Sequence, residues 1–225
     1  MRRILTALAP LLLIASAWAQ SQTPPGPETW EPAIKKFEES DRQHAPEKGA
    51  VLFVGSSSIR IWQSLAEDFP DVKVLNRGFG GSAIADSTYF AGRIIVPYRP
   101  RMIVFYAGDN DLAQGLSPDR VSDDFKAFVE RVRKDLPAVR IAFISIKPSP
   151  ARWQIVKQMQ SANEKIRTYI DTQKGLVYVD VFAAMLRDGE VRKELFGQDG
   201  LHMNGAGYKL WTSIVRPYLK MKAAP

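Results

Sequence analysis

The sequence predicts an α/β domain built on a five-stranded parallel sheet with helices on both faces. Two observations lead to this fold class. Five short apolar segments, rich in β-branched residues, alternate with longer segments whose apolar residues recur at helical spacing. The short segments are continuously apolar rather than alternating, which is typical of strands buried on both faces. The 225 residues contain no repeat of fixed period and no visible internal domain boundary.

The elements follow one another in a regular order. An amphipathic helix is expected from Trp30 to about Arg42. The clearest helix begins at Ser117, because a serine N-cap is followed by proline and then by an acidic residue in the first turn. A further helix is expected at 155–170, and the last begins near Asn204, with Pro217 expected to kink or end it. The expected strands lie at 50–54, 72–75, 102–106, 141–146 and 176–181.

The N-terminus has the pattern of a secretory signal peptide. Arg2 and Arg3 precede an apolar run, and the small residues Ala17 and Ala19 fit a cleavage site after Ala19. The run is shorter than the roughly 20 residues that span a membrane, although an uncleaved anchor is the alternative. No second long apolar run follows, so we expect a periplasmic or secreted protein without stable membrane insertion. The expected organisation is a signal peptide at 1–19, a Pro-rich linker at 20–29 and one catalytic-type domain at 30–225.

Composition excludes several classes of chemistry. The chain has no cysteine, which excludes disulfides, thiolate metal sites and cysteine nucleophiles. It has two histidines, His44 and His202, so a histidine-rich metal site is not expected. The formal net charge of +7 is spread along the chain rather than clustered. Nucleic-acid binding needs a basic patch, and none is expected here.

The residues that follow the strands carry the candidate chemistry. The carboxyl ends of parallel strands meet at one edge of a sheet, where ligands bind. This edge should therefore gather serines, glycines, an amide and an Asp/His pair, which are the groups that acyl transfer from a serine needs. The segments concerned are Gly55-Ser56-Ser57-Ser58, Gly78-Phe79-Gly80-Gly81-Ser82, Gly108-Asp109-Asn110-Asp111, Lys147-Pro148-Ser149-Pro150 and Asp199-Gly200-Leu201-His202.

Each group has a physical task in such a reaction. A serine hydroxyl needs a base, and His202 is the better candidate because His44 lies in a polar stretch before the first strand. Asp199, three residues before His202, could orient the imidazole and stabilise its charged form. The side-chain amide of Asn110 and a backbone N–H at Gly81 could stabilise an oxyanion.

Each short motif also has a plain structural interpretation. Gly-Ser-Ser-Ser is commonly a turn with a capping serine, and a Gly-Gly pair is commonly a turn. Asp199 or Asn204 could simply cap the last helix. Asp109-Asn110-Asp111 could form a turn or a loose cation site. Their joint occurrence after successive strands favours the catalytic interpretation.

The same residues resemble the sequence blocks of the SGNH (GDSL-type) serine hydrolases. The matching blocks are Gly55-x-Ser57, Gly81, Gly108-x-Asn110-Asp111 and Asp199-x-x-His202, and the likeness runs from about Trp30 to the C-terminus. The chain is most similar to the platelet-activating-factor acetylhydrolase-like, GDSL-like lipase/acylhydrolase branch. Residues 51–60 and the segment Lys147-Pro148-Ser149-Pro150-Ala151-Arg152-Trp153 support that placement. One departure is Ser56, which stands where the Gly-Asp-Ser motif has aspartate.

The resemblance implies a three-layer α/β/α sandwich of flavodoxin-like type and no cofactor. It implies Ser57 as nucleophile, His202 as base and Asp199 as its orienting partner. It also implies an oxyanion hole from the backbone N–H groups of Ser57 and Gly81 and the side chain of Asn110.

The substrate is less specified than the site. Trp153 and Phe79 are expected to wall the pocket, and aromatic walls suit an acyl chain or a sugar ring equally. Packing against the following helix is the alternative for Trp153. The expected function is an exported serine esterase that cleaves short acyl esters, acetyl among them, on a small molecule or a glycan. A catalytically silent carbohydrate-binding protein and a glycan acyltransferase are the alternatives on the same fold.

Overall fold

The computed structural model of the protein describes residues 26–220. The signal peptide expected at 1–19 and residues 20–25 of the expected linker lie outside the described residues. The described chain opens with a 3-10 helix at Pro27–Trp30, which leads directly into α1 at Glu31–Gln43. No helix among residues 26–220 has the length and apolar character to cross a membrane.

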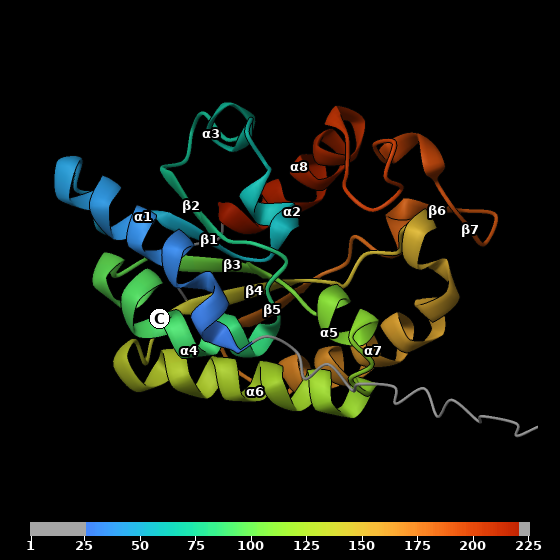
Figure 1. The fold of residues 1–225 in the computed structure, drawn as a ribbon, viewed down its shortest axis with the longest axis horizontal. Coiled ribbons are helices and arrows are strands. Elements are labelled where there is room, and N and C mark those ends of the chain that lie inside the picture. Colours follow the sequence, from blue (N-terminus) through green and yellow to red (C-terminus); the bar gives the residue numbers. More distant parts are fainter. Residues whose placement is uncertain (1–25, 221–225) are drawn as a thin grey trace, which may run out of the picture.

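Five parallel strands form the central sheet in the order β2-β1-β3-β4-β5 (Figure 1). This is the strand order of flavodoxin-like folds, and it confirms the predicted α/β sandwich. The second strand begins two residues later than predicted and continues through the polar residues Asn76 and Arg77. It lies at the edge of the sheet, where polar residues are tolerated. The strands are β1 (Val51–Gly55), β2 (Val74–Gly78), β3 (Met102–Tyr106), β4 (Arg140–Ile144) and β5 (Leu176–Val179).

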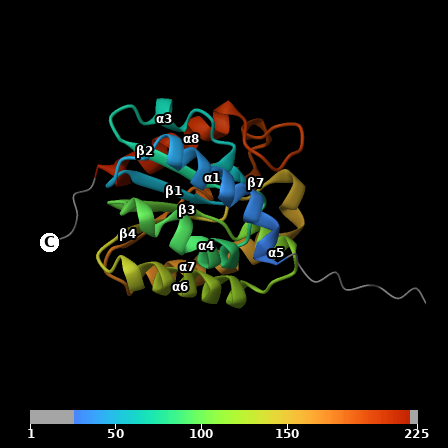
Figure 2. The same ribbon diagram turned by 60° about the vertical axis from the view of Figure 1, so that its left-hand side comes forward.

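Helices cover both faces of the sheet (Figures 1 and 2). One face carries α4 (Ile84–Ile94), α6 (Pro118–Asp135) and α7 (Val156–Asp171), and α1 packs against α4. The other face carries the short helices α2 (Ser57–Arg60) and α3 (Leu65–Asp68) together with α8 (Gly205–Leu219). A further short helix, α5 (Asp109–Ala113), follows β3.

The three inner strands, β1, β3 and β4, are buried on both faces, which explains their largely apolar sequences. Leu52 and Val54 of β1 join the core cluster under α4, α6 and α7. Val51 and Phe53 of the same strand join the cluster under α2, α3 and α8. Successive side chains of a strand point to opposite faces, so each apolar residue has a core to enter.

The ends of two helices follow the capping signals in the sequence. Ser117 accepts a hydrogen bond from the Arg120 N–H and begins α6, as predicted. Asn204 accepts the N–H groups of Ala206 and Gly207 and begins α8. Pro217 does not end α8, which continues for two more residues to Leu219. Proline removes one hydrogen bond, to the carbonyl four residues earlier, and the rest of α8 continues around this single loss.

A small antiparallel hairpin was not predicted. It pairs β6 (Leu186–Arg187) with β7 (Glu190–Val191) between β5 and α8 (Figure 1). Asp188 and Gly189 form its turn with positive φ angles of 53° and 82°. Strands of two residues are too short to produce a recognisable period in the sequence.

Candidate active site

Ser57 stands at a sharp turn between β1 and α2. Gly55, the last residue of β1, has a φ of 132°, and a Cβ there would lie 1.8 Å from the carbonyl oxygen of Tyr106. The Ser56 N–H donates to that same carbonyl at 2.9 Å. Only glycine fits this close backbone approach, and the resulting turn places Ser57 at the first position of α2.

The three consecutive serines occupy different environments. Ser56 and Ser58 are buried, with 1% and 2% of their surface exposed, whereas Ser57 is partly exposed. The Oγ of Ser57 lies 3.0 Å from Nε2 of His202. Among the three, Ser57 is therefore the serine that the fold places beside an imidazole.

His202 and Asp199 lie on the loop between the hairpin and α8. Nδ1 of His202 lies 2.6 Å from Oδ2 of Asp199. The other carboxylate oxygen of Asp199 accepts the backbone N–H groups of Leu201 and His202, each at 2.9 Å. Gly200, with a φ of 61°, allows the chain to turn tightly between the two side chains. Ser57, His202 and Asp199 thus form one continuous hydrogen-bonded chain.

The Asp199 carboxylate is held in its ionised form. The Leu201 N–H is the largest cause, followed by the His202 ring and the His202 N–H, and together they lower the pKa of Asp199 to about 2. An ionised carboxylate beside Nδ1 favours a proton on that nitrogen and leaves Nε2 to face the serine. His44, by contrast, is exposed at the C-terminal end of α1, as expected.

Asn110, in the first turn of α5, lies next to Gly81, in the loop that follows β2. Strand β1 has β2 on one side and β3 on the other, and Gly55 is in register with Gly78 and Tyr106. The loops after these strands are therefore adjacent. Nδ2 of Asn110 donates to the Ser82 carbonyl at 3.1 Å, and a Cβ built on Gly81 would lie 3.7 Å from that nitrogen.

The loop that carries Gly81 is anchored from the α5 side. Besides the bond from Asn110 to Ser82, the buried Asp111 accepts the N–H of Ile84 at 3.0 Å. Asp86 accepts the N–H of Ala83 at 2.8 Å from the other side. These bonds fix the backbone around Gly81 relative to Asn110.

The model of the GDSL-like Lipase/Acylhydrolase family matches residues 53–210, which include every residue of the hydrogen-bonded chain and the two neighbouring loops. The chain belongs to this family. As a GDSL-like acylhydrolase, it is a hydrolase that acts on ester bonds. None of the curated protein sequences compared with the acylhydrolase matched it.

Solved structures share the fold of the acylhydrolase at low sequence identity. A protein of Streptococcus pneumonia named after platelet activating factor has a TM-score of 0.74 and 22% identity, covering 85% of this chain and 95% of its own. A GDSL-like lipase of Bacteroides thetaiotaomicron has a TM-score of 0.71 and 18% identity, covering 83% and 97%. A carbohydrate esterase of family 3 from Talaromyces cellulolyticus has a TM-score of 0.64 and 19% identity, covering 76% and 96%.

Phe79 does not have the position expected of a substrate-binding residue. It is fully buried and packs edge-on against Trp30 and Phe90. Trp30 occupies the space above Gly80, where a Cβ would lie 1.8 Å from its ring. Without exposed surface, Phe79 is a core residue of the acylhydrolase, and its assignment as a pocket wall was wrong.

Trp153 is partly exposed. It lies in a 3-10 helix at Pro150–Ile155 that precedes α7, and it packs against the core cluster under α8. Trp153 also lines a shallow surface hollow together with Pro118 and Lys157. The packing alternative expected contact with the following helix, whereas the cluster that Trp153 joins lies under α8, on the opposite face of the sheet from α7. The role of Trp153 as a pocket wall stays a prediction.

Sequence reasoning missed a charged cluster behind Asn110. Asp109 forms an ion pair with Arg152 at 2.9 Å and lies 3.6 Å from the Lys147 ammonium. Arg152 also donates to Oδ1 of Asn110 at 2.9 Å. The signal was present, because Lys147 and Arg152 follow the fourth strand, but nothing in the sequence shows that they reach α5.

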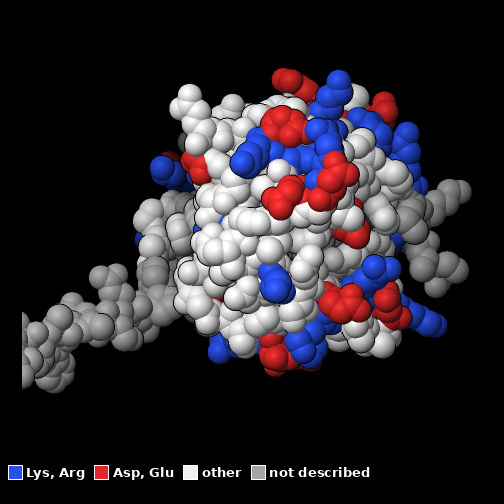
Figure 3. All heavy atoms as spheres, turned by 90° about the vertical axis from the view of Figure 1, so that its right-hand side faces the viewer, with Lys and Arg blue, Asp and Glu red and all other residues white. Residues whose placement is uncertain are grey.

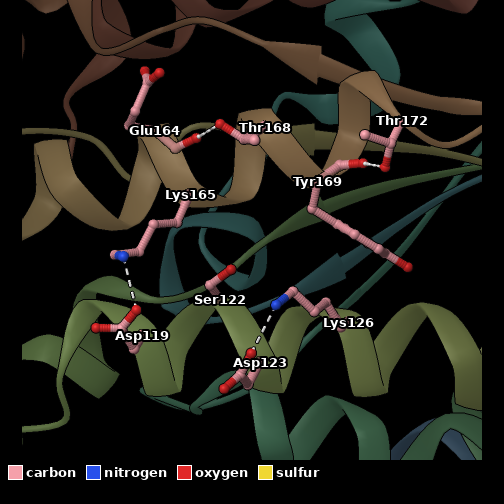
Figure 4. A pocket seen from close by; sticks show the side chains of 9 residues that line it. All are labelled: Asp119, Ser122, Asp123, Lys126, Glu164, Lys165, Thr168, Tyr169 and Thr172. Atoms are coloured by element: carbon pink, nitrogen blue, oxygen red, sulfur yellow. Dashed lines mark hydrogen bonds and ion pairs between the residues drawn. The ribbon is translucent and has the colours of Figure 1, made fainter.

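Other surface features of the acylhydrolase lie apart from these residues. A hollow of about 400 Å³ between α6 and α7 is lined by charged side chains that pair with each other, Asp119 with Lys165 and Asp123 with Lys126 (Figure 4). Figure 3 shows the side on which α5 and the hairpin lie, and it has broad uncharged areas with acidic and basic groups intermingled elsewhere. Within residues 26–220, no group of three His, Cys, Asp or Glu residues could hold a metal ion.

Asp111 predicts a specific pH dependence of stability. Burial raises the pKa of Asp111 to about 7. The folded chain therefore keeps a proton that the unfolded chain releases near pH 4, and the free energy of unfolding falls as pH rises between about 4 and 7, by at most about 1.4 kcal/mol per pH unit. Asp111→Asn keeps the acceptor for Ile84 and has no proton to lose. Its stability relative to the native chain should rise between pH 4.5 and 7.5 in urea unfolding.

A matched control is the exposed Asp71. The Asp71→Asn variant should follow the pH dependence of the native chain. If the free energies of unfolding of Asp111→Asn and the native chain change in parallel with pH over this range, burial does not raise the pKa of Asp111.

Proposed function

We propose that the acylhydrolase is an exported serine esterase that removes short acyl groups, acetyl in particular, from a small-molecule or glycan ester. The observation that carries the proposal is the chain of contacts from Asp199 through His202 to Ser57, at 2.6 Å and 3.0 Å. Nucleophile, base and orienting carboxylate at these separations are the arrangement that serine acyl transfer uses.

The reaction proceeds through an acyl-enzyme. Nε2 of His202 takes the proton of Ser57 as Oγ attacks the ester carbonyl, and Asp199 stabilises the imidazolium. The imidazolium then gives the proton to the departing alkoxide as the ester C–O bond breaks. In the second half, His202 takes a proton from water, the hydroxide attacks the acyl carbon, and Ser57 leaves with the proton returned to it.

The oxyanion of each tetrahedral intermediate needs donors in place beforehand. We assign this task to the backbone N–H groups of Ser57 and Gly81 and to the amide of Asn110. Within the described residues, Ser82 is the one acceptor that Nδ2 of Asn110 contacts, so its second hydrogen remains available. Three such donors, already in place, stabilise the negative charge that develops on the oxyanion. In water, solvent molecules would have to reorient to do the same.

Two considerations support an ester of a glycan or small molecule as the substrate. The signal-peptide pattern at residues 1–19 would deliver the enzyme to polysaccharide and environmental esters. A carbohydrate esterase shares its fold. The intermingled charges in Figure 3 form no continuous basic stripe on that face, so a nucleic-acid partner has no support there.

The test is hydrolysis of p-nitrophenyl esters of increasing acyl length by the protein purified from expression of the full chain. We expect turnover that is highest for acetyl and falls with chain length. Absence of turnover by the folded protein, together with binding of sugars, would instead support a carbohydrate-binding role. Added alcohol or sugar acceptors measure partitioning between water and acceptor, and dominant transfer would identify an acyltransferase.

Asn110→Ala should lower kcat by roughly 10²–10³-fold, as for the loss of one oxyanion donor. KM should change little, because the amide acts on charge that develops only in the transition state. Steady-state kinetics on p-nitrophenyl acetate give both values. Asn110→Asp is the matched variant, since it keeps the shape and Oδ1 but lacks the donor, and it should be at least as slow. A full rate in Asn110→Ala would remove the amide from the oxyanion hole.

A further inference from the structure

A buried charged cluster behind Asn110 has no task in the reaction described above. It consists of Asp109, Lys147 and Arg152, whose side chains are 6%, 1% and 16% exposed. The Asp109 carboxylate contacts both cations, Arg152 at 2.9 Å and Lys147 at 3.6 Å. Burying two cations beside one carboxylate is costly unless they are well bonded, so the arrangement calls for an explanation.

The contact that leaves this cluster leads to the oxyanion hole. Nη2 of Arg152 donates to Oδ1 of Asn110 at 2.9 Å. A guanidinium group has only donors, so it can donate to the oxygen of an amide but has no acceptor for the N–H groups at the other end. On the other side of the amide, the Ser82 carbonyl accepts from Nδ2 at 3.1 Å. If the amide were flipped, its N–H groups would face the N–H groups of Arg152 and its oxygen would face the Ser82 carbonyl. Both contacts disfavour the flipped orientation.

We propose that Arg152 is a positioning residue that orients the amide of Asn110 for oxyanion stabilisation. The inference rests on the proposed function, because it assigns Arg152 a task within that oxyanion hole. With Oδ1 held by Arg152 and one hydrogen of Nδ2 held by Ser82, the remaining hydrogen has a fixed direction. Preorganisation of this kind is what makes such donors effective, since no group must reorient as charge develops.

Arg152 is itself held by an ion pair, a side-chain hydrogen bond and bonds of the backbone around it. Its planar group is shared between Asp109 and Asn110, adjacent residues in the first turn of α5. Its backbone N–H donates to the Ser149 carbonyl at 3.2 Å, and the N–H of the preceding Ala151 donates to the Gly200 carbonyl at 3.0 Å. The segment that carries Arg152 therefore contacts both the oxyanion side and the Asp199–His202 loop.

Lysine could not replace arginine without loss. A planar guanidinium offers two parallel donors with fixed spacing, whereas an ammonium is a single point of charge. One ammonium cannot hold the Asp109 carboxylate and the Asn110 oxygen with the same geometry. Arg152→Lys keeps the positive charge but loses the geometry that orients the Asn110 amide, so this variant distinguishes the two effects.

The test is a double-mutant cycle with steady-state kinetics on p-nitrophenyl acetate. Arg152→Ala should lower kcat by about 10–100-fold with KM nearly unchanged, less than Asn110→Ala because Ser82 still holds Nδ2. Arg152→Lys should recover part of the rate. In the Asn110→Ala background, Arg152→Ala should lower kcat little further, because the amide through which Arg152 acts is absent. Equal losses in both backgrounds, or a raised KM with unchanged kcat, would overturn the proposal; the latter would indicate direct substrate binding.

The controls separate folding and the proposed function from this inference. Arg131, which pairs with Asp135 at 2.6 Å on α6, provides a matched arginine, and Arg131→Ala should keep the native rate. Thermal unfolding identifies any variant that fails to fold. If Ser57→Ala keeps the native rate, the proposed function fails, whatever Arg152 does. If Ser57→Ala is inactive and both Arg152 variants have the native rate, the positioning role alone fails.

A second readout does not depend on turnover. The side-chain amide of Asn110 gives a pair of ¹H–¹⁵N resonances that Asn110→Ala identifies by their loss. In Arg152→Lys, which keeps the charge, these resonances should shift, and in Arg131→Ala they should not. Unchanged resonances in Arg152→Lys and Arg152→Ala would show that Arg152 does not orient the amide.

Discussion

Replacing Ser57 with alanine is expected to lower kcat for ester hydrolysis by roughly 10⁶-fold, close to the loss of the whole catalytic arrangement. In the proposed mechanism the oxygen of this hydroxyl forms the acyl-enzyme, so no neighbouring group can take over its bond to carbon. Its Oγ lies 3.0 Å from the base, and the variant removes only that oxygen from a partly exposed position. The measurement is the pre-steady-state and steady-state release of p-nitrophenol, in which the acylation burst should also disappear.

The adjacent serines are the matched controls. Ser56 is buried, and its Oγ has no hydrogen-bond partner among the described residues, so Ser56→Ala removes an unpaired hydroxyl and should keep the native rate. Ser58 is equally buried and contributes its carbonyl to the Tyr208 hydroxyl, a bond that alanine preserves. Comparable rates for native protein and Ser57→Ala, with loss in either neighbour, would mean that a different serine is the nucleophile.

These controls also bear on the departure from the Gly-Asp-Ser motif. Ser56 occupies the N-cap position of α2 without a side-chain capping bond. Its backbone N–H donates to Tyr106, and this bond does not depend on the side chain. The turn that presents Ser57 is therefore set by the backbone of Gly55 and by the pairing of β1 with β3, which explains how serine can stand at position 56.

The sequence was informative wherever a local pattern sufficed. Continuous apolar segments located β1, β3 and β4 well because these inner strands are buried on both faces, whereas the edge strand β2 overlaps its predicted range only at Val74 and Leu75. The Ser117 and Asn204 caps marked helix starts because capping is a local interaction. The short helices α2, α3 and α5, of four or five residues, span about one turn and leave no periodicity to read.

Contacts between distant segments were beyond such patterns. Phe79 was assigned to the pocket because it follows β2, but Trp30, 49 positions earlier in the chain, covers it and fills the space over Gly80. Arg152 was visible in the sequence as part of a motif, yet its bond to Asn110 joins residues 42 positions apart. Which residues follow a strand can be predicted, whereas which of them meet depends on how the loops pack.

Replacing Asp199 with asparagine is expected to lower kcat by roughly 10³–10⁴-fold, approaching the effect of His202→Ala. Asparagine keeps Oδ1, which accepts the N–H groups of Leu201 and His202, so the turn should remain. The amide nitrogen then replaces Oδ2, which lies 2.6 Å from Nδ1 of His202. A donor at this place requires Nδ1 to be the acceptor, and the ring proton moves to Nε2. With Nε2 protonated, the ring cannot take the proton of Ser57.

Asp180→Asn is the matched control for this change. Asp180 is also an exposed loop carboxylate that accepts a backbone N–H, that of Ala183 at 3.2 Å, and its variant should keep the native rate. His202→Ala sets the lower limit of activity in the same assay. An unchanged kcat in Asp199→Asn would mean that the carboxylate only closes the turn through Leu201 and His202, and that the imidazole holds its tautomer without it. A large loss in Asp199→Asn with intact thermal stability would separate these two tasks of one side chain, because the bonds to the backbone survive the substitution and the bond to the ring does not.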